Sequence, residues 1–182
     1  MKRGAIALIM LIAMLGAYDL SGRIGMGLGF TPDVYLESGA GGLITLPVID
    51  LAVTRIGMNP NLALEPIFQF TLKNANDNTS VTLSLSALGN FLMKGHQKTN
   101  LYAKAGLGFM LYSPGGGAET EFGFNLPFGF GLEHFVSEHF SLNLAALSGF
   151  TFISNPPGGG DSYMEVKLGN AKPFAFYLVW YY

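Results

Sequence analysis

The feature that most constrains the fold of this sequence is an alternation of apolar residues with small or polar ones, which begins near Leu20 and recurs to the C-terminus. A period of two places successive side chains on opposite faces of a β-strand. The clearest stretch is residues 122–132, where Phe or Leu occupies every even position and Gly, Asn or Pro occupies every odd one. Helical spacing is scarce, so the pattern predicts an all-β protein.

Polar clusters and clusters rich in Gly and Pro separate the alternating segments, as expected of turns between strands. Seven segments alternate clearly, at residues 20–30, 62–72, 81–87, 101–111, 122–132, 140–152 and 174–182. Residues 44–57 supply one more strand, although Pro47 and Asp50 interrupt its alternation, which a bulge or a segment outside the membrane would explain. The count predicts an eight-stranded antiparallel up-and-down β-barrel. Residues 164–168 also alternate, so ten strands are the alternative.

Alternation alone fits a soluble barrel with an apolar interior as well as a membrane barrel with the faces reversed. Charged residues make up only 12% of this chain, against roughly 25% in ordinary soluble domains. The polar face carries mainly Gly, Ser, Thr and Asn, which suit a narrow interior better than a solvated exterior. The composition therefore predicts a transmembrane barrel, with an even number of strands and both chain ends on the periplasmic side. Its lumen is predicted to be filled by side chains and to leave no aqueous channel.

Four charged residues fall on the predicted inward phase: Arg23, Glu65, Lys104 and Glu133. An unpaired charge inside a barrel would be costly, so we predict that the four form one polar network in the lumen. The alternative places one or two of them at a rim, in water. Glu133 is the first candidate for that position, because a predicted turn follows it closely.

Residues 1–17 have the features of an export signal. A basic start, including Lys2 and Arg3, precedes an uncharged apolar run that is shorter than the roughly 20 residues needed to span a bilayer. We therefore predict cleavage after Ala17, with residues 18–182 as the mature barrel domain. An uncleaved anchor helix is the alternative.

The last strand ends with an apolar or aromatic residue at every second position counted back from the C-terminus: Phe174, Phe176, Leu178, Trp180 and Tyr182. This ending resembles the C-terminal assembly signal of outer-membrane barrel proteins, which implies the barrel assembly machinery as a partner during insertion. The usual final residue of that signal is Phe, so Tyr182 is a departure from it.

The whole mature chain resembles the small barrels typified by outer membrane proteins A and X, and especially their porin-like relatives with an outer membrane protein β-barrel domain. The passages that carry this resemblance are Gly25-Met26-Gly27-Leu28-Gly29-Phe30, Leu64-Glu65-Pro66, Gly131-Leu132-Glu133-His134-Phe135 and Phe140-Ser141-Leu142. The resemblance implies an exported protein of a Gram-negative outer membrane, in contact with outer-membrane lipids. It does not imply an activity, because barrels of this type host many functions.

No catalytic, cofactor-binding or metal-binding motif stands out in the sequence. His139-Phe140-Ser141 resembles the His-x-Ser pair of lipid A deacylases, but Leu142 stands where that family has Asn. His134 and His139 flank one predicted turn and lack a defined third ligand for a metal. The chain has no cysteine, which excludes thiolate sites and disulfides.

The net charge is -2 and, apart from the adjacent Lys2 and Arg3, the Lys and Arg residues are scattered singly, so nucleic acid is not an expected partner. We predict a monomeric, non-enzymatic barrel with a structural or anchoring role, or one that interacts through its loops. A lipid-acting enzyme, or a binder of lipid or a small ligand, is the alternative.

Overall fold

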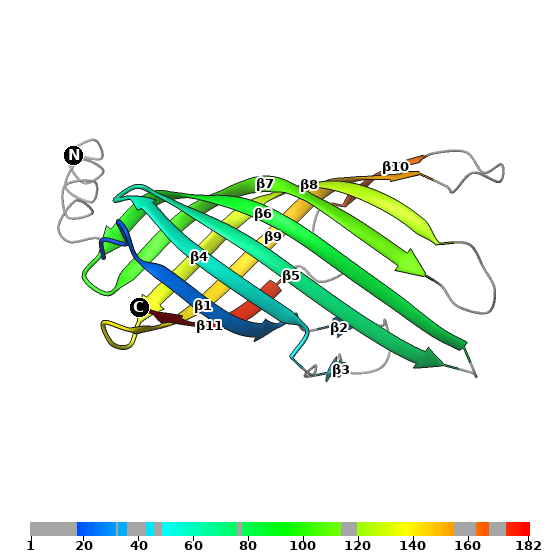
Figure 1. Cartoon of the computed structure of the whole chain (residues 1–182), viewed down its shortest axis with the longest axis horizontal. Helices are drawn as coiled ribbons and strands as arrows, with labels where there is room; N and C mark the ends of the chain where they lie inside the picture. Colours follow the sequence, from blue (N-terminus) through cyan, green and yellow to red (C-terminus); the bar gives the residue numbers. More distant parts are fainter. Residues whose placement is uncertain are drawn as a thin grey trace, which may run out of the picture.

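Pairing between strands closes the chain into a ring (Figure 1). The computed structural model describes residues 18–31, 33–35, 43–45, 49–75, 78–113, 120–154, 163–167 and 174–182. The ring contains β1 (Ile24–Phe30), β4 (Leu51–Asn59), β5 (Leu62–Ala75), β6 (Asn78–His96), β7 (Thr99–Ser113), β8 (Glu121–Phe135), β9 (Phe140–Ser154) and β11 (Phe174–Tyr181). Each strand pairs antiparallel with its neighbours, and β1 pairs with both β4 and β11. The prediction of an eight-stranded up-and-down barrel is confirmed.

The strand β10 (Tyr163–Lys167) does not add a place to this ring. It pairs with the later part of β9, with Tyr163 opposite Ile153, whereas β11 pairs with the earlier part, from Ala146 to Phe140. β10 therefore extends the sheet beyond the start of β11, within the connection between β9 and β11. The ten-strand alternative is wrong for this reason.

The two ends of the barrel differ in their connections. At one end, which we call the turn end, short turns at residues 60–61, 97–98 and 136–139 join the strands, and Tyr18 and Tyr182 lie there as well. At the other end, the loop end, two residues separate β5 from β6, but the other connections are longer, and one of them includes a separate two-stranded sheet of β2 (Asp33–Tyr35) and β3 (Leu43–Thr45). The signal peptide predicted for residues 1–17 lies outside the described residues.

The second strand of the ring starts later than predicted. Residues 43–45 belong to β3, and the ring strand β4 begins only at Leu51. The Asp50 carboxylate accepts hydrogen bonds from the Thr31 backbone N–H (3.0 Å) and from the Thr31 hydroxyl (2.5 Å), so it holds the end of β1 beside the start of β4. The register between β4 and β5 shifts between Gly57 and Asn59, which places the irregularity of this strand near the turn end.

The connection between the predicted strands at residues 81–87 and 101–111 is shorter than their spacing indicated. β6 continues through His96, the turn consists of residues 97 and 98, and Gln97 adopts a positive φ of 48°. A register shift between Leu92 and Lys94 lets the strand extend past Asn90, whose side chain faces the lumen and is fully buried. Asn90 is thus a lumen residue, although its residue type is typical of turns.

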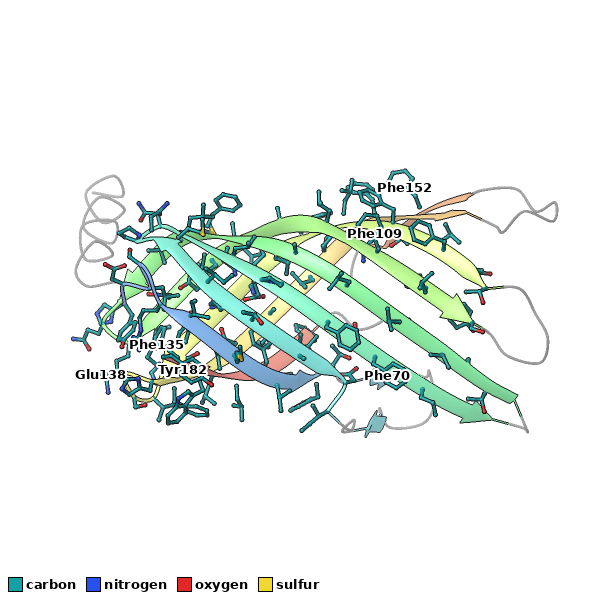
Figure 2. The ribbon with its side chains drawn as sticks, in the orientation of Figure 1. Phe70, Phe109, Phe135, Glu138, Phe152 and Tyr182 are labelled. Atoms are coloured by element: carbon teal, nitrogen blue, oxygen red, sulfur yellow. The ribbon has the colours of Figure 1, made fainter. Side chains whose placement is uncertain are left out.

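The two faces of the barrel have the polarity expected of a membrane barrel. Large apolar side chains are exposed on the outside of every ring strand, as Figure 2 shows for Phe109 and Phe152. The buried polar and charged residues are Thr31, Arg55, Glu65, Asn90, Asn100, Lys104, Glu133, Ser141 and Asn143. This distribution reverses that of a soluble barrel, in which charges face water and apolar groups fill the interior.

In the described part of the chain, no helix has the length and apolar character needed to cross a membrane.

Candidate functional site: a charge network in the lumen

Four charged side chains meet in the lumen, and all four are buried: Arg55 on β4, Glu65 on β5, Lys104 on β7 and Glu133 on β8. Arg55 bridges the two carboxylates, with its Nη1 2.6 Å from Glu133 Oε2 and its Nη2 paired with Glu65 Oε2. Lys104 Nζ lies 2.6 Å from Glu65 Oε1. Two cations and two anions give the network a formal net charge of zero.

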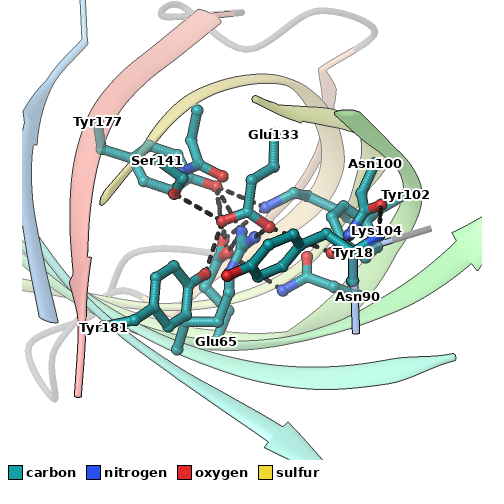
Figure 3. A network of polar contacts seen from close by, with 12 residues as sticks. Tyr18, Glu65, Asn90, Asn100, Tyr102, Lys104, Glu133, Ser141, Tyr177 and Tyr181 are labelled. Atoms are coloured by element: carbon teal, nitrogen blue, oxygen red, sulfur yellow. Dashed lines mark hydrogen bonds and ion pairs between the residues drawn. The ribbon is translucent and has the colours of Figure 1, made fainter. Parts of the chain in front are cut away.

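Neutral side chains also donate hydrogen bonds to the oxygens of the two carboxylates (Figure 3). Glu65 accepts hydrogen bonds from the Tyr177 hydroxyl (3.0 Å) and from Asn90 Nδ2 (3.1 Å). Glu133 accepts hydrogen bonds from three hydroxyls, those of Tyr181 (2.6 Å), Ser141 (2.7 Å) and Tyr102 (3.1 Å). Buried charges that are paired and hydrogen-bonded in this way form a rigid structure, because loss of any partner leaves a charge unsatisfied at low dielectric.

Every ring strand except β1 contributes a side chain to this network. The inward positions of β1 have no side chains and leave room for those of β11. These positions are Gly25, Gly27 and Gly29. A Cβ atom at Gly25 would overlap the side chains of Val179 and Tyr181, and one at Gly29 would overlap Tyr177. The alternating glycines of β1 therefore let the large inward side chains of β11 lie against the neighbouring strand.

Gly131 on β8 has the same role for Lys104. A Cβ atom at Gly131 would overlap the Lys104 Cε atom. The Lys104 ammonium group is held by Glu65 and by the Tyr177 hydroxyl, each at 2.6 Å, so the side chain cannot move aside without losing these partners.

The structure brings together three of the four residues predicted to share a network, namely Glu65, Lys104 and Glu133. Glu133 is fully buried, although it lies close to a turn. Arg23 stands apart from them, contrary to our prediction. It precedes β1 at the turn end, where its guanidinium donates to the Tyr18 hydroxyl (2.5 Å) and to the backbone carbonyl of Glu138.

Arg55, and not Arg23, is the arginine of the network. Our sequence analysis did not identify it. The predicted strand over residues 44–57 loses its alternation, so no inward phase could be assigned there. Within the true strand β4, Leu51, Val53 and Arg55 are buried at every second position. A start at Leu51 would have identified Arg55 as a cation on the inward phase.

The N-terminal segment closes over the network at the turn end. The Tyr18 ring stacks on Phe135 with centroids 3.9 Å apart, and Tyr18 exchanges backbone hydrogen bonds with the Asn100 amide group. Leu20 is buried against the backbone of β4. Next to it, hydrogen bonds from the Ser21 hydroxyl and backbone N–H lower the pKa of the exposed Asp19.

The lumen is filled by side chains, as predicted, in only one half of the barrel. Side chains of the network occupy the half nearer the turn end. On the loop side of Glu65 and Tyr177 the structure contains a cavity of about 280 Å³. Two buried atoms of the network, Arg55 Nε and Asn90 Oδ1, have no hydrogen-bond partner within the protein.

The structure places Ser141, His134 and His139 in separate contacts. Ser141 Oγ donates to Glu133, while His139 Nδ1 lies 3.1 Å from the backbone carbonyl of Tyr181 and its ring stacks on Trp180. His134 Nδ1 contacts the Thr99 hydroxyl at 2.9 Å. Across the part of the chain that the structure describes, no three His, Cys, Asp or Glu residues group into a metal site.

The residues predicted as an assembly signal lie on the outer face of β11. Phe174, Phe176, Leu178, Trp180 and Tyr182 are all exposed there, whereas Tyr177, Val179 and Tyr181 between them are buried. The terminal strand therefore presents one apolar and aromatic row to the outside of the barrel.

The reversed faces, the closed ring of eight strands and the buried charge network describe a small transmembrane barrel. A family model described as "Outer membrane protein beta-barrel domain" matches residues 4–171. The chain belongs to this family. It is an outer-membrane β-barrel protein whose lumen holds four buried charged residues, Arg55, Glu65, Lys104 and Glu133.

One solved structure similar to this outer-membrane β-barrel protein is the crystal structure of Ail, the attachment invasion locus protein of Yersinia pestis. The two chains are 17% identical, the match covers 88% of this chain and 98% of Ail, and the TM-score is 0.46. No curated protein matches the sequence.

Proposed function

We propose that this protein is an integral barrel of a Gram-negative outer membrane whose lumen is closed to ion flow, with a non-enzymatic role as an anchor or as a display of interacting loops. The observation that supports this proposal best is the position of the charges. Arg55, Glu65, Lys104 and Glu133 are buried inside and joined by ion pairs, while exposed apolar side chains cover the outside. This arrangement is stable only if hydrocarbon surrounds the barrel.

The proposal includes how the protein reaches its membrane. Residues 1–17 are removed as a signal peptide, and the barrel assembly machinery recognises the terminal strand through its outward row from Phe174 to Tyr182. The outward row supports this role, because its apolar and aromatic side chains share one face of the strand and make no part of the lumen network. The turn end then faces the periplasm, and the inserted protein is a monomer in contact with outer-membrane lipids.

The experiment that tests location is membrane fractionation of cells that express the full chain. We expect the protein to stay in the outer membrane after a carbonate wash and to migrate faster on gels before boiling than after it. A mature chain that stays dissolved and monomeric without detergent, with its β-structure intact, would contradict membrane insertion.

Closure of the lumen is tested separately, by reconstituting the purified protein in planar lipid bilayers. We expect no discrete conductance steps from the wild-type protein, because the paired side chains of Arg55, Glu65, Lys104 and Glu133 occupy the lumen near the turn end. Regular conductance steps in proportion to the protein added would contradict a closed lumen, and would leave the membrane location unaffected.

A second candidate function is the binding of an ordered lipid. An apolar groove of about 1090 Å³ lies on the outer surface of the barrel around β1. The exposed side chains of Met26, Leu28, Phe68 and Leu178 line it. Its polarity favours an acyl chain. Lipid that copurifies with the protein and survives detergent exchange would support this function, whereas acyl chains released from lipopolysaccharide or phospholipid would instead indicate an enzyme.

A further inference from the structure

The cavity in the loop-end half of the lumen has the features of a ligand site. Its volume of about 280 Å³ corresponds to about nine water molecules at about 30 Å³ each in the liquid. Glu65 and Tyr177 form its floor, so the charge network separates it from the turn end. The cavity therefore lies on the loop side of the charge network.

The walls of the cavity carry polar and apolar side chains in different proportions on its two sides. Adjacent strands β5 and β6 contribute mainly hydroxyl and amide groups, from Gln69, Thr71, Thr82, Ser84 and Ser86, beside the apolar Ile67 and Leu88. In the ring order, β9 and β11 lie directly opposite β5 and β6, and they contribute mainly apolar side chains, which include Leu147, Ile153 and Ala175, beside the hydroxyl of Thr151. A molecule that fits both walls carries hydroxyl groups along one edge and C–H groups on another face.

The charges around the cavity favour a neutral ligand. Glu65 is the charged residue that lines it, and both of its carboxylate oxygens are engaged by Arg55, Lys104, Asn90 and Tyr177. The network as a whole has a formal charge of zero. An anionic ligand would therefore lose its hydration without gaining a counter-charge, and it would also lie near the Asp50 carboxylate behind Thr31 and Gln69.

One buried acceptor in the cavity wall lacks a partner in the protein. The Asn125 Oδ1 atom is buried and receives no hydrogen bond. It lies with the Ser86 hydroxyl over Gly108, where a Cβ atom would overlap both groups. Buried amide oxygens are nearly always hydrogen-bonded, so this site requires a donor from water or from a ligand.

We propose that the loop-end half of the lumen binds a small, neutral, polyhydroxylated molecule of about monosaccharide size. One hydroxyl of this molecule donates to Asn125 Oδ1, others exchange hydrogen bonds with the β5 and β6 side chains, and its C–H face packs on β9 and β11. The inference deepens the small-ligand alternative and rests on the proposed barrel only for the fold that shapes the pocket.

The test uses the mature protein, labelled with ¹⁵N, in micelles of a zwitterionic detergent that has no sugar headgroup. D-glucose is titrated while NMR records the side-chain amide signals of Asn125 and Gln69. We expect a saturable shift of both signals with a Kd in the millimolar range. Leucine at position 82 (Thr82→Leu) adds bulk to the polar wall and should weaken binding at least tenfold.

The matched control is Thr54→Leu, which makes the same chemical change outside the lumen. Thr54 lies on the outward face of β4 and lines the external groove. It should bind glucose as the wild type does. No saturable shift, an equal response in Thr82→Leu, or equal binding of glucose 6-phosphate would overturn the proposal, with water as the occupant in the first case. The heat-modifiable gel shift of the same sample reports the barrel fold independently, so a failed titration does not test the proposed membrane role.

Discussion

Replacing Glu65 by Gln tests whether the paired charges hold the barrel together. The substitution keeps the size and shape of the side chain and removes one of the two negative charges in the lumen. Arg55 and Lys104 then share the single carboxylate of Glu133, and only Arg55 contacts it directly. The new amide group also points hydrogen-bond donors at a site that several donors already occupy.

The expected cost follows from the burial of these groups. Breaking a buried ion pair by removing one partner costs about 3–5 kcal/mol, because the remaining charge stays buried without compensation. The amide oxygen of Gln keeps one acceptor, so we expect a loss of about 3 kcal/mol. For a domain of 150–250 residues, each kcal/mol lowers the melting temperature by about 2–4 °C, which gives a decrease of about 6–12 °C.

The assay heats the purified protein in detergent to graded temperatures and measures the fraction of the folded, faster-migrating band. Glu138→Gln makes the same chemical change in an exposed turn, and it should melt within about 1 °C of the wild type, as exposed charges contribute little. A Glu65→Gln protein that also melts with the wild type would refute the reasoning.

A double-mutant cycle separates charge balance from packing. Lys104→Met alone should also destabilise the barrel, whereas Glu65→Gln combined with Lys104→Met returns the lumen to a formal charge of zero. The loss of stability in the double variant should therefore be smaller than the sum of the two single losses. Strict additivity would show that the two groups do not interact through their charges.

Three further predictions concern other parts of the barrel. Arg23→Met should lower stability by no more than about 1 kcal/mol in the same melting assay, because Arg23 lies at the rim and makes its contacts in partial contact with water. Gly131→Ala should cost about 1–3 kcal/mol by displacing Lys104, whereas Gly89→Ala, which meets only an exposed Phe ring on the outer face, should be nearly neutral; equal melting of the two variants would contradict this role for Gly131. Deleting Tyr182 should slow insertion by the assembly machinery in cells without changing the melting of the purified barrel, and unchanged insertion would contradict its role in the signal.

How far the sequence predicted the network depends on the strand. Glu65, Lys104 and Glu133 lie in segments with unbroken alternation, so their inward phase could be counted from neighbouring apolar residues. Arg55 lies in a strand whose start is obscured by Asp50, which is held by a contact with Thr31 from another strand. The start of that strand, and with it the phase of Leu51, Val53 and Arg55, is fixed by its pairing with β1 and β5.

The sequence by itself determined the all-β class and the side of the sheet that faces lipid, and it limited the number of ring strands to eight or ten. These properties follow from the period of the side chains and from the scarcity of charge, both of which are local or compositional.

Only the tertiary structure decided which charges meet and where the lumen is hollow. Arg55 and Glu133 are separated by 78 residues in the chain and meet because ring closure sets the register of every strand against its neighbours. The cavity remains because side chains from opposite strands do not fill the space between them. Which side chains face one another across the lumen is fixed only when the ring closes.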